Sequence, residues 1–238
     1  MREPSLQVNS GASLSVRRVG QEQTPVIIID GFAQDTSEVI DFACTGAAYG
    51  DDATSAYPGI RAKLPRSYVV PLLNSIFRLL YQVYAVPANL KLKPVNTVYS
   101  LIATPEDELS AAQCVPHFDS NTGWYLAVLH YLNPGEFCST GLFRHRPTGF
   151  ERITTERLGE FLASSRAYTE KHGEPPQRYI NGSAGQFELY EEIAYKPNRL
   201  VVYPGNLLHS GLVDPAVDIN PDPRSGRLTA NIFVDFRA

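Results

Sequence analysis

The stretch Cys114–Pro134, CVPHFDSNTGWYLAVLHYLNP, joins a short polar segment to a run of aromatic and aliphatic residues that ends at a proline. Such a run, bounded by turn residues, predicts a buried β-strand. His117 and Asp119 stand two positions apart just ahead of it. Residues i and i+2 of an extended segment project from the same face, so we expect these two side chains to point together.

The spacing alone is weak evidence, since five histidines and 25 acidic residues often produce such a pair by chance. A second pair, His172 and Glu174, lies in the polar stretch TEKHGEPPQ, which we interpret as a solvated loop. The wider context must therefore separate a functional pair from an accidental one.

Similar apolar runs recur from Val95 onward. They are short, rich in β-branched and aromatic residues, and separated by Gly, Pro and Asn turns, which predicts a sandwich or barrel and not a βαβ sheet. The runs are Val95–Ala103, Trp124–Leu132, Gly141–Arg146, Gln186–Tyr195, Arg199–Pro204 and Arg227–Phe236.

The chain up to Pro94 has a different pattern. Pro25–Asp30 predicts a strand, and a short helix is expected to follow with Thr36 as its N-cap. Ser67–Tyr84 predicts a longer helix with Pro71 in its first turns, and Tyr57–Pro65 is interpreted as a turn-rich loop. The apolar positions of the longer helix recur at three and four residues: Leu72, Leu73, Ile76, Phe77, Leu80 and Val83.

We interpret residues 1–238 as a single domain. Residues 1–94 would supply N-terminal strands and supporting helices, and residues 95–238 the β core. A helix over Thr154–Tyr168, with Leu158, Phe161 and Leu162 on one side, is expected to interrupt the strands.

The bulk composition excludes several classes of protein. The net charge is −4 and no long Lys/Arg run is present, so we expect no nucleic acid partner. No stretch approaches the roughly 20 apolar residues that span a bilayer, and the start of the chain has no apolar signal segment. The three cysteines form no C-x-x-C pair and are interpreted as small buried hydrophobes in a reducing, cytoplasmic environment.

A metal site needs a third ligand beside His117 and Asp119. The best candidate is His209, which follows an apolar strand and a Pro-Gly turn in RLVVYPGNLLHSG. Two imidazoles and one carboxylate on one face are the ligand set of non-haem Fe(II), although a zinc hydrolase can use similar ligands. The final strand favours iron chemistry with a carboxylate cosubstrate. Arg227 and Thr229 share one of its faces, where the guanidinium offers two parallel N–H donors to a carboxylate and the hydroxyl offers a further donor.

The order His117-x-Asp119, His209, Arg227-x-Thr229 resembles the Fe(II)- and 2-oxoglutarate-dependent oxygenases. The surrounding phrases LAVLHYLNP, STGLF, RLVVYPGNLLHSG and SGRLTANIFV are similar to the prolyl-hydroxylase-like branch of that superfamily. The likeness runs from about Val95 to Phe236, and QCVPHFD and YPGIRA are similar to an uncharacterised bacterial subgroup.

The resemblance implies a double-stranded β-helix, a cupin-like jelly roll, with His117, Asp119 and His209 as catalytic ligands of Fe(II). It further implies that Arg227 grips the distal carboxylate of 2-oxoglutarate with help from Thr229. Tyr131 corresponds to a tyrosine that reaches that carboxylate in some relatives, and Tyr99 or His130 are alternatives. The insertion of about residues 151–185 departs from the family's pattern and is open to interpretation as a lid.

The implied activity is hydroxylation of an unactivated C–H bond in a small molecule or an amino-acid residue of a peptide or protein, with release of succinate and CO₂. Two alternatives stay open: a non-catalytic barrel that binds a small carboxylate or a partner protein, and a cupin-like metal enzyme that does not use 2-oxoglutarate. The sequence decides neither the substrate nor the oligomeric state.

Other polar and aromatic residues have plainer interpretations. His130 is expected as a core histidine with satisfied hydrogen bonds, and His145 as a surface residue at a strand end. Trp124 and Tyr125 are expected in the core or in a pocket wall. Arg224 is a weaker candidate than Arg227 for the carboxylate anchor, because it lies in the loop NPDPRSG.

Overall fold

The computed structural model describes residues 3–51 and 57–238. Within them the chain forms two antiparallel sheets and three α-helices, so the expected mainly β fold with supporting helices is confirmed. The strands are β1 (Ser13–Val19), β2 (Thr24–Asp30), β3 (Gly50–Asp51), β4 (Gly59–Lys63), β5 (Lys91–Ile102), β6 (Leu126–Tyr131), β7 (Thr140–His145), β8 (Phe187–Ile193), β9 (Arg199–Pro204), β10 (His209–Gly211) and β11 (Thr229–Arg237). The helices are α1 (Ser37–Thr45), α2 (Arg66–Val83) and α3 (Leu158–His172).

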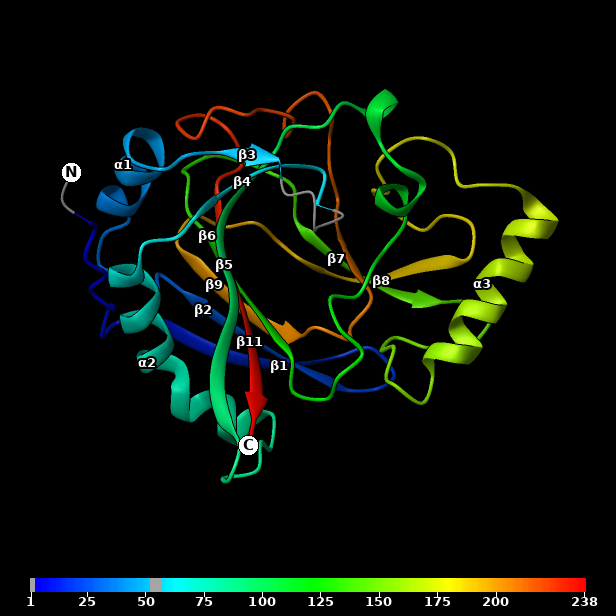
Figure 1. The fold of residues 1–238 in the computed structure, drawn as a ribbon, viewed down its shortest axis with the longest axis horizontal. Helices are drawn as coiled ribbons and strands as arrows, with labels where there is room; N and C mark the ends of the chain where they lie inside the picture. The colour runs from blue at the N-terminus through cyan, green and yellow to red at the C-terminus, as the bar shows by residue number, and fades with distance from the viewer. Residues whose placement is uncertain (1–2, 52–56) are drawn as a thin grey trace.

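The larger sheet has the strand order β1-β2-β9-β6-β11-β5-β4-β3, and the smaller sheet has the order β10-β7-β8. Strands from both ends of the chain therefore meet in the larger sheet, and the last strand, β11, lies at its centre between β6 and β5. Figure 1 shows β11 in red running beside β5 in green.

One core lies between the outer face of the larger sheet and the helices α1 and α2. The buried face of α2 follows its three-and-four spacing through Leu72, Leu73, Ile76 and Leu80. Phe77 was also expected on that face, but 43% of it is exposed. It lies at the edge of the buried face, next to Ile76. Pro71 lies within the second turn of α2, near the start of the helix as predicted.

A second core lies on the inner face of the larger sheet, where the smaller sheet faces it. Leu129 of β6 and Val201 and Tyr203 of β9 contribute from the larger sheet, and Leu142 of β7 contributes from the smaller one. Neighbouring residues of one strand face opposite cores because side chains alternate across a sheet. This alternation determines which residues reach the space between the sheets.

The structure corrects some of the expected elements. The loop interpretation of Tyr57–Pro65 is wrong, because β4 lies within it and pairs with β5. Gly59 permits this pairing, since a Cβ there would lie 2.0 Å from the carbonyl oxygen of Leu101. The expected boundary between Pro94 and Val95 falls inside β5. β1 was not predicted at all.

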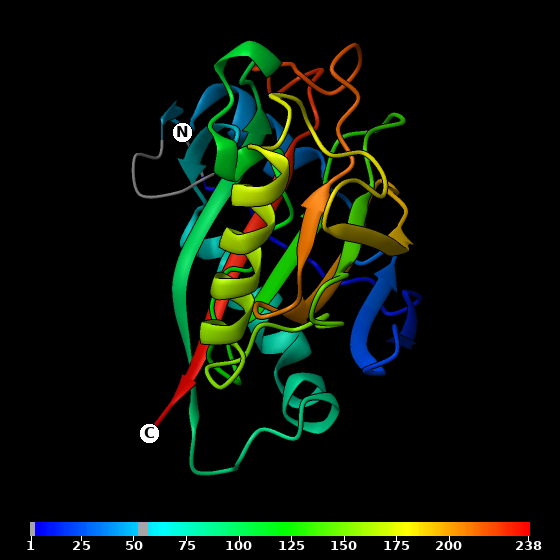
Figure 2. The same ribbon diagram turned by 90° about the vertical axis from the view of Figure 1, so that its right-hand side faces the viewer.

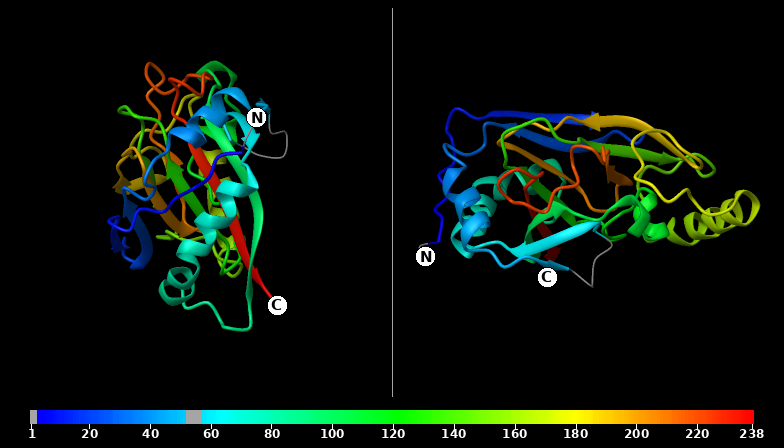
Figure 3. Two further views of the ribbon diagram at one scale, coloured as in Figure 1. Left: turned by 90° about the vertical axis from the view of Figure 1, so that its left-hand side faces the viewer. Right: turned by 90° about the horizontal axis from the view of Figure 1, so that it is seen from above.

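The helix of the insertion begins at Leu158 and ends at His172, four residues later than predicted at each end. Phe161 is buried, whereas Leu162 is 50% exposed. His172, expected in a loop, lies in the last turn of this helix. The views in Figures 1, 2 and 3 place α3 at the end of the molecule opposite α1 and α2, where Phe161 packs in one buried cluster with Phe143 of β7 and Phe187 of β8.

Two further expectations concern the cysteines and the membrane. Cys114 and Cys138 are buried, Cys44 is half-buried, and none of the three forms a disulfide. No helix among the described residues is both long enough and apolar enough to cross a bilayer.

Candidate metal centre

Backbone pairing brings the two candidate histidines together. The N–H of His117 donates to the carbonyl of His209, and the N–H of His209 donates to the carbonyl of His117, each at 2.9 Å. Their rings consequently lie side by side, with centroids 4.4 Å apart. His209 also begins β10, which pairs with β7, so the smaller sheet holds this histidine in place.

The third residue is fixed by the turn that precedes β10. The N–H of Asp119 donates to the carbonyl of Gly205 at 2.6 Å. A side chain at position 205 would not fit, because a Cβ there would lie 2.6 Å from the Tyr125 ring and 3.3 Å from the Cβ of Asp119. The Pro-Gly sequence therefore lets the two chain segments approach closely.

The ligand atoms of the three residues converge. Asp119 Oδ1 lies 3.8 Å from His117 Nε2, and Asp119 Oδ2 lies 3.7 Å from His209 Nε2. One nitrogen or oxygen from each of the three residues lies within 4.8 Å of the other two. The structure thus brings together the three residues expected as metal ligands.

The protonation of His209 suits a metal ligand. Its Nδ1 lies 2.8 Å from the carbonyl oxygen of Leu207, which can only accept, so Nδ1 carries the proton and donates. Nε2 is left as the ring nitrogen that can bind a metal, and it lies 3.7 Å from Asp119 Oδ2. A hydrogen bond from the second ring nitrogen to a carbonyl is the usual way in which a protein orients a metal-binding histidine.

The Asp119 carboxylate is only partly compensated by its neighbours at the centre. Oδ2 of Asp119 is buried and has no hydrogen-bond partner among the described residues. Burial raises the pKa of Asp119, although the nearby His209 and Arg61 act in the opposite direction. Desolvation, with help from His209 and Arg61, lowers the pKa of His117 to about 3, so its ring is neutral at neutral pH.

These observations fit a divalent cation. Metal ligands must be deprotonated, and here two imidazoles and one carboxylate with an unsatisfied oxygen face one point. A cation between them would satisfy the orphaned oxygen and offset the cost of burying the carboxylate.

The three residues line a cavity of about 120 Å³ that also contains Arg227 and Thr229. Arg227 is buried, and its Nε donates to the carbonyl of Cys138 at 2.9 Å. The guanidinium carbon lies 5.3 Å from the centre of the Tyr131 ring and 5.7 Å from that of Tyr195. The two tyrosine rings and the hydrogen bond to the Cys138 carbonyl hold the Arg227 side chain in place. Its two terminal nitrogens are then the pair of donors that can bind a carboxylate.

Tyr131 and Thr229, the two residues expected to assist Arg227, both have hydroxyls with partners near the cavity. The Tyr131 hydroxyl lies 2.8 Å from that of Thr140, which lines the cavity, and its ring contacts Arg227. The hydroxyl of Thr229 lines the cavity and lies 3.4 Å from the carbonyl oxygen of Ser100.

The structure removes both alternatives to Tyr131. Tyr99 pairs with Ala230 on the outer face of the larger sheet, where its hydroxyl donates to the carbonyl of Val39 at 3.0 Å. Its expected role in cosubstrate binding is therefore wrong, because it faces the helices and not the cavity. His130 is the core histidine expected, with ring nitrogens 2.6 Å from the Tyr68 hydroxyl and 3.0 Å from Asn198 Oδ1.

Three of the plainer interpretations can also be checked. His145 was expected at the surface, but it is fully buried between Thr148 and Gln186 because the insertion folds back over the end of β7. Trp124 is 36% exposed and does not belong to the core. Arg224 is exposed, as expected for a loop residue.

Sequence reasoning missed two residues that line the cavity. Arg61 of β4 lies over the Tyr57 ring at 4.5 Å and was hidden by the loop interpretation. Asn231 of β11 donates to the Ser100 hydroxyl at 2.9 Å, while its Oδ1 is buried without a hydrogen-bond partner among the described residues. Its position two residues after Thr229 on the same face was the signal that could have found it.

The fold and the centre together define a mainly β protein with a two-histidine, one-carboxylate candidate metal site between two sheets. The chain belongs to DUF6445, a family of unknown function, which matches residues 10–234. A comparison with curated proteins finds no match.

Proposed function

We propose that this protein is an Fe(II)- and 2-oxoglutarate-dependent oxygenase that hydroxylates an unactivated C–H bond. The observation that carries the proposal is the convergence of His117, Asp119 and His209 in one small cavity with the buried cation of Arg227. Two imidazoles and one carboxylate bind non-haem iron and leave other coordination positions open. The buried arginine in the same cavity suits a carboxylate cosubstrate, and this favours iron chemistry with 2-oxoglutarate in the proposal.

The fold that accompanies the proposal is a double-stranded β-helix of the jelly-roll type. In support, β5, β6, β9 and β11 are the central strands of the larger sheet, and β7, β8 and β10 make up the smaller one. The segment at His117 extends the smaller sheet through its bridge to His209. Eight consecutive segments divided in this way between two facing sheets follow the jelly-roll pattern.

The side chains have separate roles in this proposal. His117, Asp119 and His209 would hold Fe(II), and the fork of Arg227 would bind the distal carboxylate of 2-oxoglutarate, with Thr229 beside it and Tyr131 fixing the guanidinium. The bound iron and 2-oxoglutarate would supply the oxidant, with succinate and CO₂ as products. The protein would orient the cosubstrate and keep it away from bulk water.

The first test measures cosubstrate binding without turnover. Calorimetry with Mn(II) in place of iron should show 2-oxoglutarate binding to the parent. Arg227→Ala should weaken it about ten- to a hundredfold, since a charge-assisted hydrogen bond contributes about 1.5–3 kcal/mol. Arg227→Lys should also bind less well, because a lysine lacks the planar fork. Arg224→Ala, at an exposed arginine nearby in the sequence, is the matched control and should bind like the parent.

The second test measures turnover. With Fe(II), oxygen and 2-oxoglutarate the parent should release succinate even without a substrate, and Asp119→Asn should not. Metal binding without any affinity for 2-oxoglutarate would favour a cupin-like enzyme with another cosubstrate. Binding of both without succinate release would favour a non-catalytic barrel.

A further inference from the structure

A second cavity, of about 750 Å³, lies beside the metal centre, and His117 lines both. We infer that this larger cavity is the substrate site and that it takes an uncharged molecule with an apolar body. The inference rests on the proposed function for the reaction. The position and wall chemistry of the cavity are properties of the described residues themselves.

The sizes of the two cavities assign them different ligands. Pockets for molecules of drug size measure about 300–1,000 Å³, so the space of about 120 Å³ around the metal centre suits only a small cosubstrate. The neighbouring space of about 750 Å³ falls inside that range. A molecule bound there would lie beside the metal centre, because His117 lines both spaces.

The insertion builds much of the wall of this cavity. Phe161, Ser165, Tyr168, Thr169 and His172 all line it from α3, and their spacing of three and four residues places them on one helix face. The segment after α3 supplies a further wall from Gly173 to Phe187. The part of the chain that departs from the resembled family is thus the part that shapes this site.

The inner wall is apolar. Phe161, Ile180 and Phe187 are buried side chains that line the cavity, and Phe118 packs edge-on against Phe161 with ring centres 6.0 Å apart. Phe118 lies directly between the ligands His117 and Asp119 in the sequence. A charged group placed against this wall would lose its hydration without gaining a partner, which is costly.

The polar groups of the wall are mainly neutral. Gln186 is oriented by His145, whose Nε2 lies 2.9 Å from the Gln186 side-chain oxygen, so its amide nitrogen is the group with donors to offer. Ser165 lies 3.4 Å from the same histidine nitrogen. The charged side chains of Glu174 and Arg178 are exposed and belong to the rim, and the half-buried carboxylate of Glu106 already accepts a hydrogen bond from the N–H of Tyr179 at 3.0 Å. Hydroxyls and amides recognise neutral polar groups, and they do not replace a counter-ion.

The test compares two fluorescent probes that share the same rings. N-phenyl-1-naphthylamine is uncharged, and 1-anilinonaphthalene-8-sulfonate carries a sulfonate. The uncharged probe should bind the metal-free parent saturably, with at least tenfold higher affinity than the sulfonate. Equal or tighter binding of the sulfonate would overturn the inferred ligand class.

Matched glycine variants test the location. Gly182 lines the cavity, has no positive φ, and a Cβ there would meet no atom within 4 Å, so Gly182→Phe fills free space without forcing the backbone. It should weaken binding of the uncharged probe at least tenfold. Gly159→Phe, in α3 and outside the cavity wall, has equal room and should bind like the parent. Ala111→Phe, on the opposite wall, is a second filling variant. Unchanged binding in both filling variants would overturn the location.

The last readout separates this inference from the proposed function. Mn(II) at the centre should broaden the proton NMR signals of the bound uncharged probe, and His209→Ala should abolish that broadening while leaving probe affinity unchanged. If Mn(II) and 2-oxoglutarate bind but no broadening occurs, the substrate-site inference fails and the proposed function stands. If the probe binds in the cavity but Mn(II) and 2-oxoglutarate do not bind, the proposed function fails, and with it the assignment of the probe site to a substrate.

Discussion

The Asp119 carboxylate shows the conflict between stability and function at the scale of one residue. Its side chain is half-buried, and its buried Oδ2 has no hydrogen-bond partner among the described residues. A buried charge without a partner destabilises the folded state, so this residue is retained at a cost in stability. Sites that bind a ligand are commonly destabilised in this way.

Asp119→Asn should therefore stabilise the metal-free protein. We expect its free energy of unfolding, from urea denaturation at pH 7 with a chelator present, to rise by about 1 kcal/mol, because an amide is less costly to bury than a charge. The same variant should lose Mn(II) binding. Glu170→Gln, at an exposed carboxylate of α3, should change neither quantity. A less stable Asp119→Asn protein would show that another group already compensates the charge.

His130 provides a test of pH dependence away from the metal centre. Burial lowers its pKa to about 4 from the ordinary histidine value of 6.5. Between these pH values the unfolded chain binds the extra proton and the folded protein does not, so folding stability is full above pH 6.5 and falls as the pH drops toward 4. The difference in pKa corresponds to a loss of about 3 kcal/mol across that window.

His130→Gln should remove this part of the acid sensitivity. The free energy of unfolding should fall less between pH 7 and pH 4 than it does in the parent, even if the variant is less stable at pH 7 through its lost bond to Tyr68. His172→Gln changes an exposed histidine, and its free energy of unfolding should fall with pH as steeply as that of the parent. Parallel curves for the parent and His130→Gln would contradict a buried, neutral His130.

The candidate ligands could be predicted from the sequence because i and i+2 residues share a face and because a Pro-Gly turn preceded His209. Tyr99 could not be placed, since the assignment of a face depends on strand register, and a shift of one residue reverses it. Tyr99 and Ser100 are neighbours, yet the register of β5 against β11 sends one to the helices and the other toward the cavity side.

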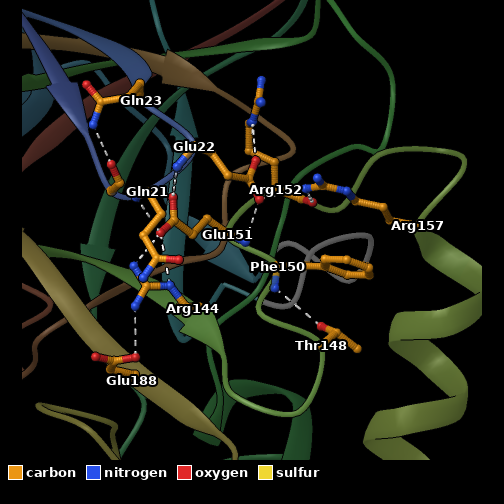
Figure 4. A network of polar contacts seen from close by, with 11 residues as sticks. Gln21, Glu22, Gln23, Arg144, Thr148, Phe150, Glu151, Arg152, Arg157 and Glu188 are labelled. Carbon is orange, nitrogen blue, oxygen red and sulfur yellow. Dashed lines mark hydrogen bonds and ion pairs between the residues drawn. The ribbon is translucent and has the colours of Figure 1, made fainter.

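At the scale of elements, a buried network fixes the start of the insertion. Figure 4 shows Glu151 at its centre, between the turn that joins β1 to β2 and the side chain of Arg144. The fully buried carboxylate accepts hydrogen bonds from the N–H groups of Gln21 and Glu22 and from Arg144 at 2.6 and 3.0 Å. Glu22 in turn binds Arg152 and Arg157, just ahead of α3.

Glu151→Gln should destabilise the protein by about 3 kcal/mol, because it removes the fully buried charge of the pair and leaves the half-buried Arg144 without its main counter-ion. The measurement is urea denaturation at pH 7. Glu188→Gln is the control: this second partner of Arg144 is 43% exposed, and its loss should cost about 1 kcal/mol or less. Equal effects of the two substitutions would mean that Glu151 acts only as a surface ion pair does.

Helices and strands in which apolar residues recur at regular spacing could be predicted from the sequence, and the others could not. Runs of apolar residues found β5 to β9 and β11, and the three-and-four repeat found α2, whereas the three-residue strand β10 was not predicted. β4 was missed because Tyr57, Pro58 and Gly59 have the composition of a turn, whereas a close contact with β5 decides their conformation. The burial of His145 depends on Gln186, 41 residues later, so no local pattern could reveal it.

At the scale of the whole molecule, the centre joins parts of the chain that are far apart in sequence. His117 and Asp119 precede β6, whereas His209 begins β10 and is paired with the smaller sheet. These groups are separated in the unfolded chain, so a metal ion should bind the folded protein much more tightly than it binds the unfolded chain. Binding should then stabilise the whole fold by mass action.

Mn(II) should raise the melting temperature of the parent in proportion to the logarithm of its concentration. At a hundred times the dissociation constant the stabilisation is about 2.7 kcal/mol, which corresponds to roughly 5–10 °C for a chain of this size. Differential scanning fluorimetry over a Mn(II) series measures the shift, with Mg(II) as a cation that prefers oxygen ligands and should have a smaller effect. His209→Ala and Asp119→Asn should show no Mn(II)-dependent shift, whereas His172→Gln should respond like the parent. A shift of equal size in His209→Ala would mean that the ion binds elsewhere, and the three residues would then be a polar cluster without a metal.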